Sequence, residues 1–407
     1  MEVPSLEGMT AEPVLATQPA PLKRATKGQV RTFGLIRERF NEERRIALNP
    51  VAVGSLTAAG HRVLIESQAG IGANFADLRY AEHGAEIVDS CGAVFAGADV
   101  MVKVGPLQPN ETALVRERQI IISALHLGTT TRDGLAHLLD VGATGIGFEF
   151  MADATGALPI VRMMHEIMGS MSVQVAARYL ESSEGGKGIM LGGISGVPPS
   201  NVVILGAGVV GEWAARTALG YGANVIVLDT DLGALRVLEP YLARRVTTAM
   251  ATDEYLARAI PRADVVIGAL ATAGERAPVI VSEEMVRRMQ PNSIIVDAVV
   301  DQGGCIATSR PTTQSDPVYR VHEVIHYGVP NIPSNAARTA SNALSNVLFP
   351  YLQYIGESAT LQEALWGNVV LRNGTYAYRR HLTKKNLAHR FGLPHRDIEL
   401  LIASSLS

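Results

Sequence analysis

The chain has 407 residues, of which 47% are hydrophobic and 18% are charged, and its formal net charge is −3. This composition predicts a soluble globular protein with two or more domains and full cores, and it excludes a largely disordered chain. The small negative charge provides no broad cationic field, and no run of Lys and Arg is interleaved with aromatic residues, so we do not expect nucleic acid as a partner.

Cysteine content and hydropathy indicate the compartment. Cys91 and Cys305 are the two cysteines, too few for a disulfide framework and not spaced as metal ligands, so we expect a reducing compartment and no metal site. No apolar run approaches the roughly 20 residues that span a bilayer, and the opening residues lack the positive-then-apolar order of a secretion signal. We therefore expect a cytoplasmic protein with no membrane contact. Residues 1–30 are rich in Pro, Ala and Thr, which predicts a flexible N-terminal extension.

Short apolar runs alternate with amphipathic ones along the first part of the chain. The first convincing strand is TFGLI at residues 32–36, and further strand-like runs are HRVLIE, ADVMVKV, RQIIISALHL and ATGIGFEF. Amphipathic stretches such as NPVAVGSLTAAG and TTRDGLAHLLDVG separate them. Strand and helix in repetition predict a parallel sheet covered by helices on both faces.

The same pattern restarts after a long helical stretch near residues 160–182 and a Gly-rich connection at 185–200. NVVILGAG, ANVIVLD, ADVVIGAL and NSIIVDAVV read as strands of a second sheet. The tail from Asn335 has a helical period and offers no strand pattern, so we expect its helices to cross back and pack on the first unit.

These patterns predict an α/β fold with two doubly wound domains and a cleft between them. The second unit is expected to be a Rossmann-type domain inserted into the first, which is therefore discontinuous. The predicted limits are 31–160 for the first part of the discontinuous domain, 161–334 for the inserted domain and 335–407 for the C-terminal helices.

The glycine motif in VVILGAGVVGEWAARTALGYGANVIVLD carries the most specific local signal. Gly206, Gly208 and Gly211 follow a strand and open a helix. The first permits a tight turn, the second lets a pyrophosphate approach the backbone, and the third lets helix and strand pack closely. Asp229 ends the next strand, where its carboxylate can accept ribose hydroxyls and would repel a 2′-phosphate. The motif predicts a site for NAD rather than NADP; the alternative is a turn that needs glycines for packing alone.

Three ionisable residues lie at or just beyond the ends of strands predicted for the first domain: Arg45, Lys103 and His126. Open α/β sheets bind ligands at the carboxyl ends of their strands. Each residue also has a structural explanation, because Arg and Lys mostly lie on solvated faces and a histidine at a strand end is often a core residue. Arg44 could point inward instead of Arg45.

Asp301 raises a separate question, because it follows the apolar run SIIVDAVV (residues 293–300), which reads as a buried strand. A carboxylate beside apolar surface is costly unless it has a partner or a task. Beside a nicotinamide cofactor, two cations, an imidazole and this acid describe a site for a small 2-oxo or 2-amino acid. The cations would hold the carboxylate and the carbonyl or amine, while His126 and Asp301 would move protons.

At these residues the chain resembles the alanine dehydrogenase family, which also includes the nucleotide-binding subunit of proton-translocating transhydrogenase. The resemblance runs from about Thr32 to the C-terminus. The motifs that carry it include RIALNP, GHRVLIESQAGIGANFAD, VMVKV, GALPIVRMMHEIMG, GGISGVPPSNVVILGAGVVG, VDAVVDQGGC and VPNIPSNAARTAS.

The resemblance implies reversible, NAD-dependent oxidative deamination of L-alanine to pyruvate and ammonium, in a homo-oligomer that is commonly a hexamer. It implies a carboxylate-binding role for Arg45, substrate binding by Lys103, and catalytic roles for His126 and Asp301. The cofactor positions that it implies are His165, Gly206, Gly208, Val209, Val210, Gly211, Asp229, Leu270, Val300 and Asn331.

Two positions depart from the family pattern. His165 stands where the family usually has a serine that contacts a phosphate, and Ala234 stands where a basic residue often lies near the ribose. Three alternatives remain open at this stage: a dehydrogenase of another small amino or 2-oxo acid, a transhydrogenase-like module that passes hydride to a partner, and a binding protein without catalysis.

Overall fold

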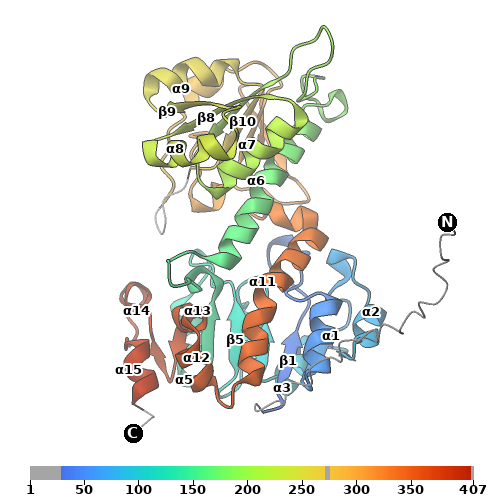
Figure 1. The fold of residues 1–407 in the computed structure, drawn as a ribbon, viewed down its shortest axis with the longest axis vertical. Helices are drawn as coiled ribbons and strands as arrows, with labels where there is room; N and C mark the ends of the chain where they lie inside the picture. Colours follow the sequence, from blue (N-terminus) through green and yellow to red (C-terminus); the bar gives the residue numbers. More distant parts are fainter. Residues whose placement is uncertain (1–28, 271–275, 405–407) are drawn as a thin grey trace, which may run out of the picture.

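The computed structural model describes residues 29–270 and 276–404. The extension predicted at 1–30 therefore lies almost wholly outside the described residues. The described chain forms two α/β lobes, each built on one sheet (Figure 1). This confirms the predicted fold class of two doubly wound units.

The first lobe is built on an eight-stranded sheet with the order β15-β14-β6-β5-β4-β1-β2-β3. The pairs among β1 to β6 are all parallel, whereas β14 runs antiparallel to both of its neighbours. Its strands are β1 (Thr32–Leu35), β2 (Arg62–Glu66), β3 (Glu86–Val88), β4 (Val100–Val102), β5 (Ile120–Ser123), β6 (Thr144–Gly147), β14 (Thr375–Tyr378) and β15 (His381–Leu382).

Helices cover both faces of this sheet. Side chains on its two faces therefore pack into two different apolar clusters. Phe33 and Leu35 pack into one apolar cluster, whereas Ile36 and Met101 belong to another. The helices around this sheet are α1 (Pro50–Ala58), α2 (Asp77–Glu82), α3 (Cys91–Gly97), α4 (Pro109–Thr112), α5 (Arg132–Asp140), α12 (Leu361–Gly367), α13 (Val369–Gly374), α14 (Lys385–Phe391) and α15 (Ile398–Ala403).

The C-terminal segment corrects one prediction. It was expected to supply helices only, yet β14 and β15 extend the first sheet beyond β6. Tyr376 and Ala377 are buried there in the same apolar cluster as Ile121 of β5. The tail thus completes the sheet of the first lobe as well as packing on it.

The second lobe is built on a seven-stranded sheet with the order β12-β13-β11-β10-β7-β8-β9, in which only the β12–β13 pair is antiparallel. Its strands are β7 (Asn201–Leu205), β8 (Asn224–Asp229), β9 (Thr247–Met250), β10 (Val265–Gly268), β11 (Ile294–Asp297), β12 (Val318–Val321) and β13 (Val324–Tyr327). Its helices are α7 (Val209–Tyr221), α8 (Leu232–Tyr241), α9 (Asp253–Ala259) and α10 (Glu283–Arg287). All strands of this sheet come from one continuous stretch, whereas the first sheet draws on both ends of the chain; the limits predicted at 160 and 334 stay predictions.

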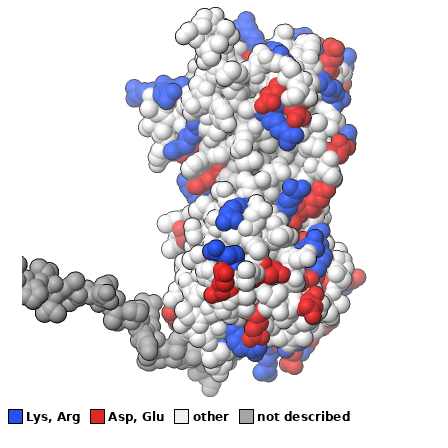
Figure 2. Space-filling view, turned by 90° about the vertical axis from the view of Figure 1, so that its right-hand side faces the viewer, with Lys and Arg blue, Asp and Glu red and all other residues white. Residues whose placement is uncertain are grey.

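Two helices of 21 residues meet at the junction of the lobes: α6 (Pro159–Tyr179) runs from the first lobe to the second, and α11 (Ala337–Glu357) starts at the junction and packs along the first lobe (Figure 1). Helix α6 packs so closely on α7 that a Cβ at Gly169 would lie only 2.3 Å from the carbonyl oxygen of Val210. Figure 2 shows one side of the molecule, on which basic and acidic side chains lie interspersed. Among the described residues, no helix combines the length and hydropathy needed to cross a bilayer.

Candidate active site and cofactor site

The glycine loop between β7 and α7 has the geometry that its sequence predicts. Gly206 has a φ of 113°, in the region that favours glycine, and a Cβ there would lie 2.6 Å from the carbonyl oxygen of Ala269. A Cβ at Gly211 would lie 1.9 Å from the carbonyl oxygen of Gly206. Gly208 is the N-cap of α7, and a Cβ there would meet open space.

This loop fits a dinucleotide phosphate, because the space beside Gly208 is bordered by the first turn of α7. The N–H groups of Val209 and Val210 lie in that first turn, where an α-helix has no internal acceptors for them. Such N–H groups and the helix dipole favour a bound anion. The open space therefore lies where a pyrophosphate could approach the backbone.

Asp229 ends β8 beside this loop, and its side chain is buried. Its carboxylate accepts hydrogen bonds from the N–H of Ala207 at 2.5 Å and from the N–H of Asp231 at 2.8 Å. The carboxylate therefore holds the glycine loop against the end of β8. A carboxylate has about four acceptor positions, so these two bonds leave capacity for ribose hydroxyls.

The other predicted cofactor positions lie around the same loop or near the lobe junction. Leu270 follows β10, and its N atom lies 2.9 Å from an ideal Cβ at Gly206. Val300 is buried in the 3-10 turn Val300–Gln302. His165 lies one turn before Gly169 on α6; its imidazole has no hydrogen bond to a described residue, and burial lowers the pKa of that imidazole. Their contacts with a cofactor stay predictions.

Arg45 lies in an ionic cluster that joins the two lobes. Its Nε donates to Glu43 Oε1 at 2.8 Å, and one terminal nitrogen donates to Glu43 Oε2 at 2.6 Å and to Asn331 Oδ1 at 2.8 Å. Asn331 Nδ2 in turn donates to Glu43 Oε2 at 2.7 Å. The other terminal nitrogen faces the sulfur of Met164 at 3.1 Å. Arg45 therefore makes the contacts expected of an inward residue, whereas Arg44 is exposed.

The pKa of the Glu43 carboxyl reflects this pairing. Burial would raise its pKa, but the charge and hydrogen bonds of Arg45 outweigh that effect and lower the pKa from 4.5 to about 2. The lowered pKa stabilises the folded protein above pH 4.5, and this contribution disappears as the pH falls from about 4.5 to about 2.

We expect Glu43→Gln to lower the free energy of unfolding at pH 7 by about 3 kcal/mol, the free energy that corresponds to a pKa lowered from 4.5 to about 2. The loss should shrink at pH 3, where the wild-type protein has already lost part of the same contribution. Urea unfolding of both proteins at pH 7 and pH 3 tests this. An equal loss at both pH values would show that the ionised carboxylate is not the cause.

Lys103 follows β4 directly and is fully buried. Its Nζ lies 3.1 Å from Glu38 Oε2 and 3.1 Å from Glu111 Oε2, and both carboxylates are buried. Burial lowers the pKa of the Lys103 ammonium, but the two carboxylates outweigh this effect and the pKa is raised. Burial raises the pKa of Glu38, which Lys103 offsets only in part. Two acidic partners thus keep this lysine charged, and an ammonium has a third proton to donate.

His126 and Asp301 come from different lobes and interact electrostatically. Asp301 lies in the 3-10 turn after β11, with its side chain open to solvent but largely surrounded by protein. Desolvation by the surrounding protein raises the pKa of the Asp301 carboxyl, and the charge of nearby His126 opposes this shift. The imidazole of His126 also packs edge-to-face on Phe40, with ring centroids 5.7 Å apart. The structure therefore brings an imidazole and a carboxylate together at the junction of the lobes.

Two predicted strands end earlier than their apolar runs suggest. The run at 293–300 forms a strand only to Asp297, so Asp301 lies in a turn rather than at a strand end. Strand β5 ends at Ser123, three residues before His126. Both residues therefore lie on short connections beyond the sheets, as ligand-binding residues of α/β folds commonly do.

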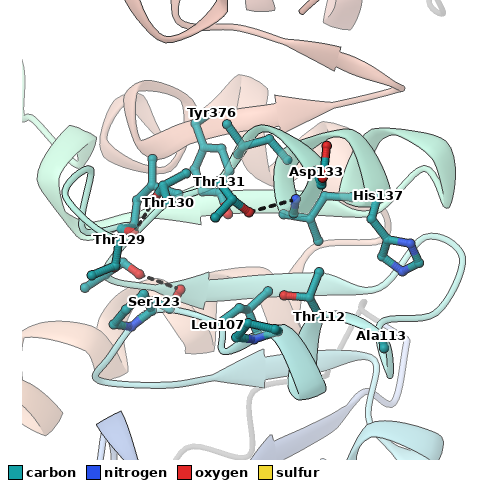
Figure 3. A pocket seen from close by; sticks show the side chains of 17 residues that line it. Leu107, Thr112, Ala113, Ser123, Thr129, Thr130, Thr131, Asp133, His137 and Tyr376 are labelled. Atoms are coloured by element: carbon teal, nitrogen blue, oxygen red, sulfur yellow. Dashed lines mark hydrogen bonds between the residues drawn. The ribbon is translucent and has the colours of Figure 1, made fainter. Parts of the chain in front are cut away.

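A hollow of about 540 Å³ lies against the ionic cluster and is lined by Glu38, Glu43 and Arg45 among others. A second hollow of about 370 Å³ lies elsewhere in the first lobe, between α4, α5 and the turn after β5, and includes His137 and Tyr376 (Figure 3). Arg45 and Asp301 do not line the second hollow. We place the candidate active site beside the first, because Arg45 lines it; Lys103, His126 and Asp301 line neither of these two hollows.

Sequence reasoning missed the acidic partners Glu38, Glu43, Glu111 and Glu149. Three of them pair with Arg45 or Lys103, and Glu149 contacts the backbone of His126. The segment RERFNEERR offered a signal, because its acids stand beside a buried strand and a candidate cation. Within residues 29–270 and 276–404, no group of three His, Cys, Asp or Glu side chains could hold a metal ion.

A glycine loop in one lobe and convergent ionisable groups from both lobes define an α/β protein of the dinucleotide-dependent dehydrogenase class. Two family models match the chain: "Alanine dehydrogenase/PNT, N-terminal domain" over residues 34–168 and "Alanine dehydrogenase/PNT, C-terminal domain" over residues 172–385. The chain belongs to the alanine dehydrogenase/PNT family, which confirms the resemblance inferred from its motifs.

Individual relatives agree with this assignment. The chain is 41% identical over 368 residues to an alanine dehydrogenase of Methanococcus maripaludis, a match that covers 90% of this chain and 98% of the relative. A solved L-alanine dehydrogenase structure aligns with a TM-score of 0.84 and 39% identity, covering 89% of this chain and 99% of that one. A transhydrogenase from Sinorhizobium meliloti shares the fold, with a TM-score of 0.75, 23% identity and coverage of 87% and 99%.

Proposed function

We propose that this chain catalyses the reversible, NAD-dependent oxidative deamination of L-alanine to pyruvate and ammonium. The observation that carries the proposal is that His126 of one lobe lies within electrostatic reach of Asp301 of the other, while Arg45 of the first lobe is hydrogen-bonded to Asn331 of the second. The relatives named alanine dehydrogenase support the choice of substrate.

The substrate carboxylate is held by the terminal nitrogen of Arg45 that Glu43 leaves free and by the third proton of Lys103. When bound, NAD accepts the hydride that leaves the α-carbon. His126 and Asp301 then move the protons as water adds to the resulting imine and ammonium departs. Bonds from Glu43 and Asn331 fix the guanidinium before substrate arrives, which reduces the entropy lost in binding.

The experiment that tests this function follows NADH absorbance with purified protein, NAD and a panel of small amino acids. We expect alanine to give the highest kcat/KM. A higher value for glycine or another amino acid would change the substrate and keep the chemistry. No reduction with any amino acid, despite NADH binding, would favour a module that passes hydride to a partner.

Asp229 is proposed to select NAD over NADP. We expect Asp229→Asn to weaken NAD binding by about tenfold or more, because a charge-assisted bond to a ribose hydroxyl contributes about 1.5–3 kcal/mol. Asparagine keeps one acceptor oxygen, which can still hold the N–H of Ala207 in the glycine loop, and gives up the bond to the N–H of Asp231, which lies outside that loop. Fluorescence titration with both coenzymes measures the change, and NADP binding should weaken little or improve. Equal losses for both coenzymes would contradict a ribose contact.

We also propose a cytoplasmic homo-oligomer, which the family resemblance implies to be a hexamer. Support comes from a projecting turn in which Met190, Ile194 and Val197 are exposed by 69%, 62% and 56%. Apolar side chains gathered on such a turn favour burial against another surface, here a second copy of the chain. Light scattering coupled to size exclusion gives the number of subunits.

A further inference from the structure

His126 adopts a backbone conformation that is uncommon for residues other than glycine. Its φ is 54°, in the left-handed region that glycine and asparagine enter most readily. Residues held in this region persist only where their surroundings impose the conformation. The contacts that impose it at His126 therefore determine where the imidazole points.

The carboxylate of Glu149 makes the principal contacts of this kind. Its Oε1 accepts hydrogen bonds from the N–H of His126 at 2.8 Å and from the N–H of Leu125 at 3.0 Å, and its Oε2 lies 3.0 Å from the same Leu125 nitrogen. An ionised acceptor forms stronger bonds than a neutral one. One side chain thus binds two consecutive backbone N–H groups of the turn.

The register of the sheet explains why a side chain is needed. Strands β5 and β6 pair in parallel up to Ser123 and Gly147, and the two chains then diverge. Leu125 and Glu149 stand two residues beyond that last pair. The Glu149 carboxylate accepts the N–H bonds that a continuing strand would have accepted, and it therefore ends the ladder while keeping the turn attached to β6.

Threonine hydroxyls fix the rest of the turn. Thr129 Oγ1 lies 3.1 Å from Nδ1 of His126, and Thr130 Oγ1 donates to the carbonyl oxygen of Leu125 at 2.8 Å. With Nδ1 occupied by Thr129, Nε2 is the ring nitrogen left for a substrate. Backbone and ring are therefore both held, and Glu149 supplies the charged contact.

We propose that Glu149 is a positioning residue for His126, which holds the turn after β5 in its left-handed conformation and thereby aims Nε2 at the substrate. This inference rests on the proposed function, since His126 acts there as the proton carrier. Glu149 itself touches neither substrate nor cofactor in this role.

The test replaces Glu149 with glutamine, which keeps the size of the side chain and one acceptor oxygen but removes the negative charge and puts an NH2 group, which cannot accept, at the position of Oε2, 3.0 Å from the Leu125 nitrogen. We expect kcat for alanine oxidation to fall about 10- to 100-fold, because displacement of a catalytic group by about 1 Å has effects of this size. The Kd for NADH should stay within about twofold. Glu149→Asp, which keeps the charge but is one methylene shorter, should lower kcat in the same direction and serves if the glutamine variant does not fold.

A double-mutant cycle distinguishes positioning from general damage. In a His126→Ala background, Glu149→Gln should have no further effect on kcat, because residues that act through one another are not additive. Asp397→Asn is the matched control: Asp397 also accepts two consecutive backbone N–H bonds, at the start of α15, and its replacement should leave kcat unchanged. Equal losses from Glu149→Gln in both backgrounds would overturn the proposal.

The imidazole signals of His126 provide a readout that does not depend on turnover. Its ring lies against Phe40, so release of the turn should change the ring-current shift of the His126 protons in Glu149→Gln and leave it unchanged in Asp397→Asn. Unchanged signals in Glu149→Gln would overturn the positioning role. If the wild-type protein oxidises no substrate, the proposed function fails, while these signals still decide whether Glu149 positions the ring.

Discussion

Replacing His126 with alanine is expected to lower kcat for alanine oxidation by about 100-fold or more, the usual contribution of a positioned proton carrier. The imidazole lies at the junction of the lobes, within electrostatic reach of Asp301, and its Nδ1 is held by Thr129. Alanine removes the group that exchanges protons and leaves the cations for the substrate carboxylate in place. Initial rates of NADH formation at saturating alanine measure the loss.

A histidine elsewhere in the first lobe supplies the control. His137 lies on α5 beside the second hollow, and its Nε2 has no hydrogen-bond partner in the described structure. His137→Ala removes the same side chain without touching the site, so kcat should stay close to the wild-type value. NADH binding should be retained in both variants. A His126→Ala protein with near-normal turnover would refute the proton-carrier role.

The features that could be predicted from the sequence are those that depend on neighbouring residues. The strand–helix alternation and the loop with Gly206, Gly208 and Gly211 are set by local patterns, and the structure confirms both. The first and third glycines occupy positions where a Cβ would collide with backbone. A rule about backbone geometry can therefore be applied without knowing what packs around it.

Strand ends were less predictable, because apolar residues continue beyond the last hydrogen-bonded pair. Leu125 and Val299 are buried although neither belongs to a strand. Their side chains pack in the core while the backbone has already turned. The two candidate proton carriers, His126 and Asp301, therefore lie on turns that an apolar run alone does not reveal.

Strands β14 and β15 could not be predicted for a different reason. They have four and two residues, and TYAY has no strong alternation of apolar and polar positions. Their conformation depends on the open edge of β6, which lies more than 200 residues earlier in the chain. Such pairing is a tertiary effect that overrides weak local preference.

The candidate site also contains residues that could be predicted from the sequence and partners that could not. Arg45, Lys103 and Asp301 could be selected because each lies at or beyond the end of an apolar run that predicts a strand. Their partners could not, since Lys103 and Glu38 are 65 residues apart and Arg45 and Asn331 are 286 residues apart. The sequence indicates which side chains are costly to bury but not which distant groups compensate for them.

Replacing Lys103 with methionine is expected to lower the free energy of unfolding by about 3–5 kcal/mol, the usual cost of removing one member of a buried ionic cluster. Glu38 and Glu111 would remain buried without their cation, so the pKa of the Glu38 carboxyl, which burial already raises, should rise further in the folded protein. A carboxyl whose pKa is higher in the folded protein than in the unfolded chain stabilises the folded protein at low pH, and this contribution is lost as the pH rises. The variant should therefore be less destabilised at pH 5 than at pH 8 in urea unfolding.

A triple variant separates the structural role of Lys103 from substrate binding. Lys103→Met combined with Glu38→Gln and Glu111→Gln leaves no uncompensated charge, and each glutamine keeps an acceptor for the backbone N–H bonds of Val104 and Gln108. Stability should return toward the wild-type value, because a neutral replacement of a buried ionic cluster is often tolerated. If Lys103 donates its third proton to the substrate carboxylate, KM for alanine should stay raised by about tenfold or more in this stable protein. Recovery of both stability and KM would show that the lysine serves only to neutralise its two acidic partners.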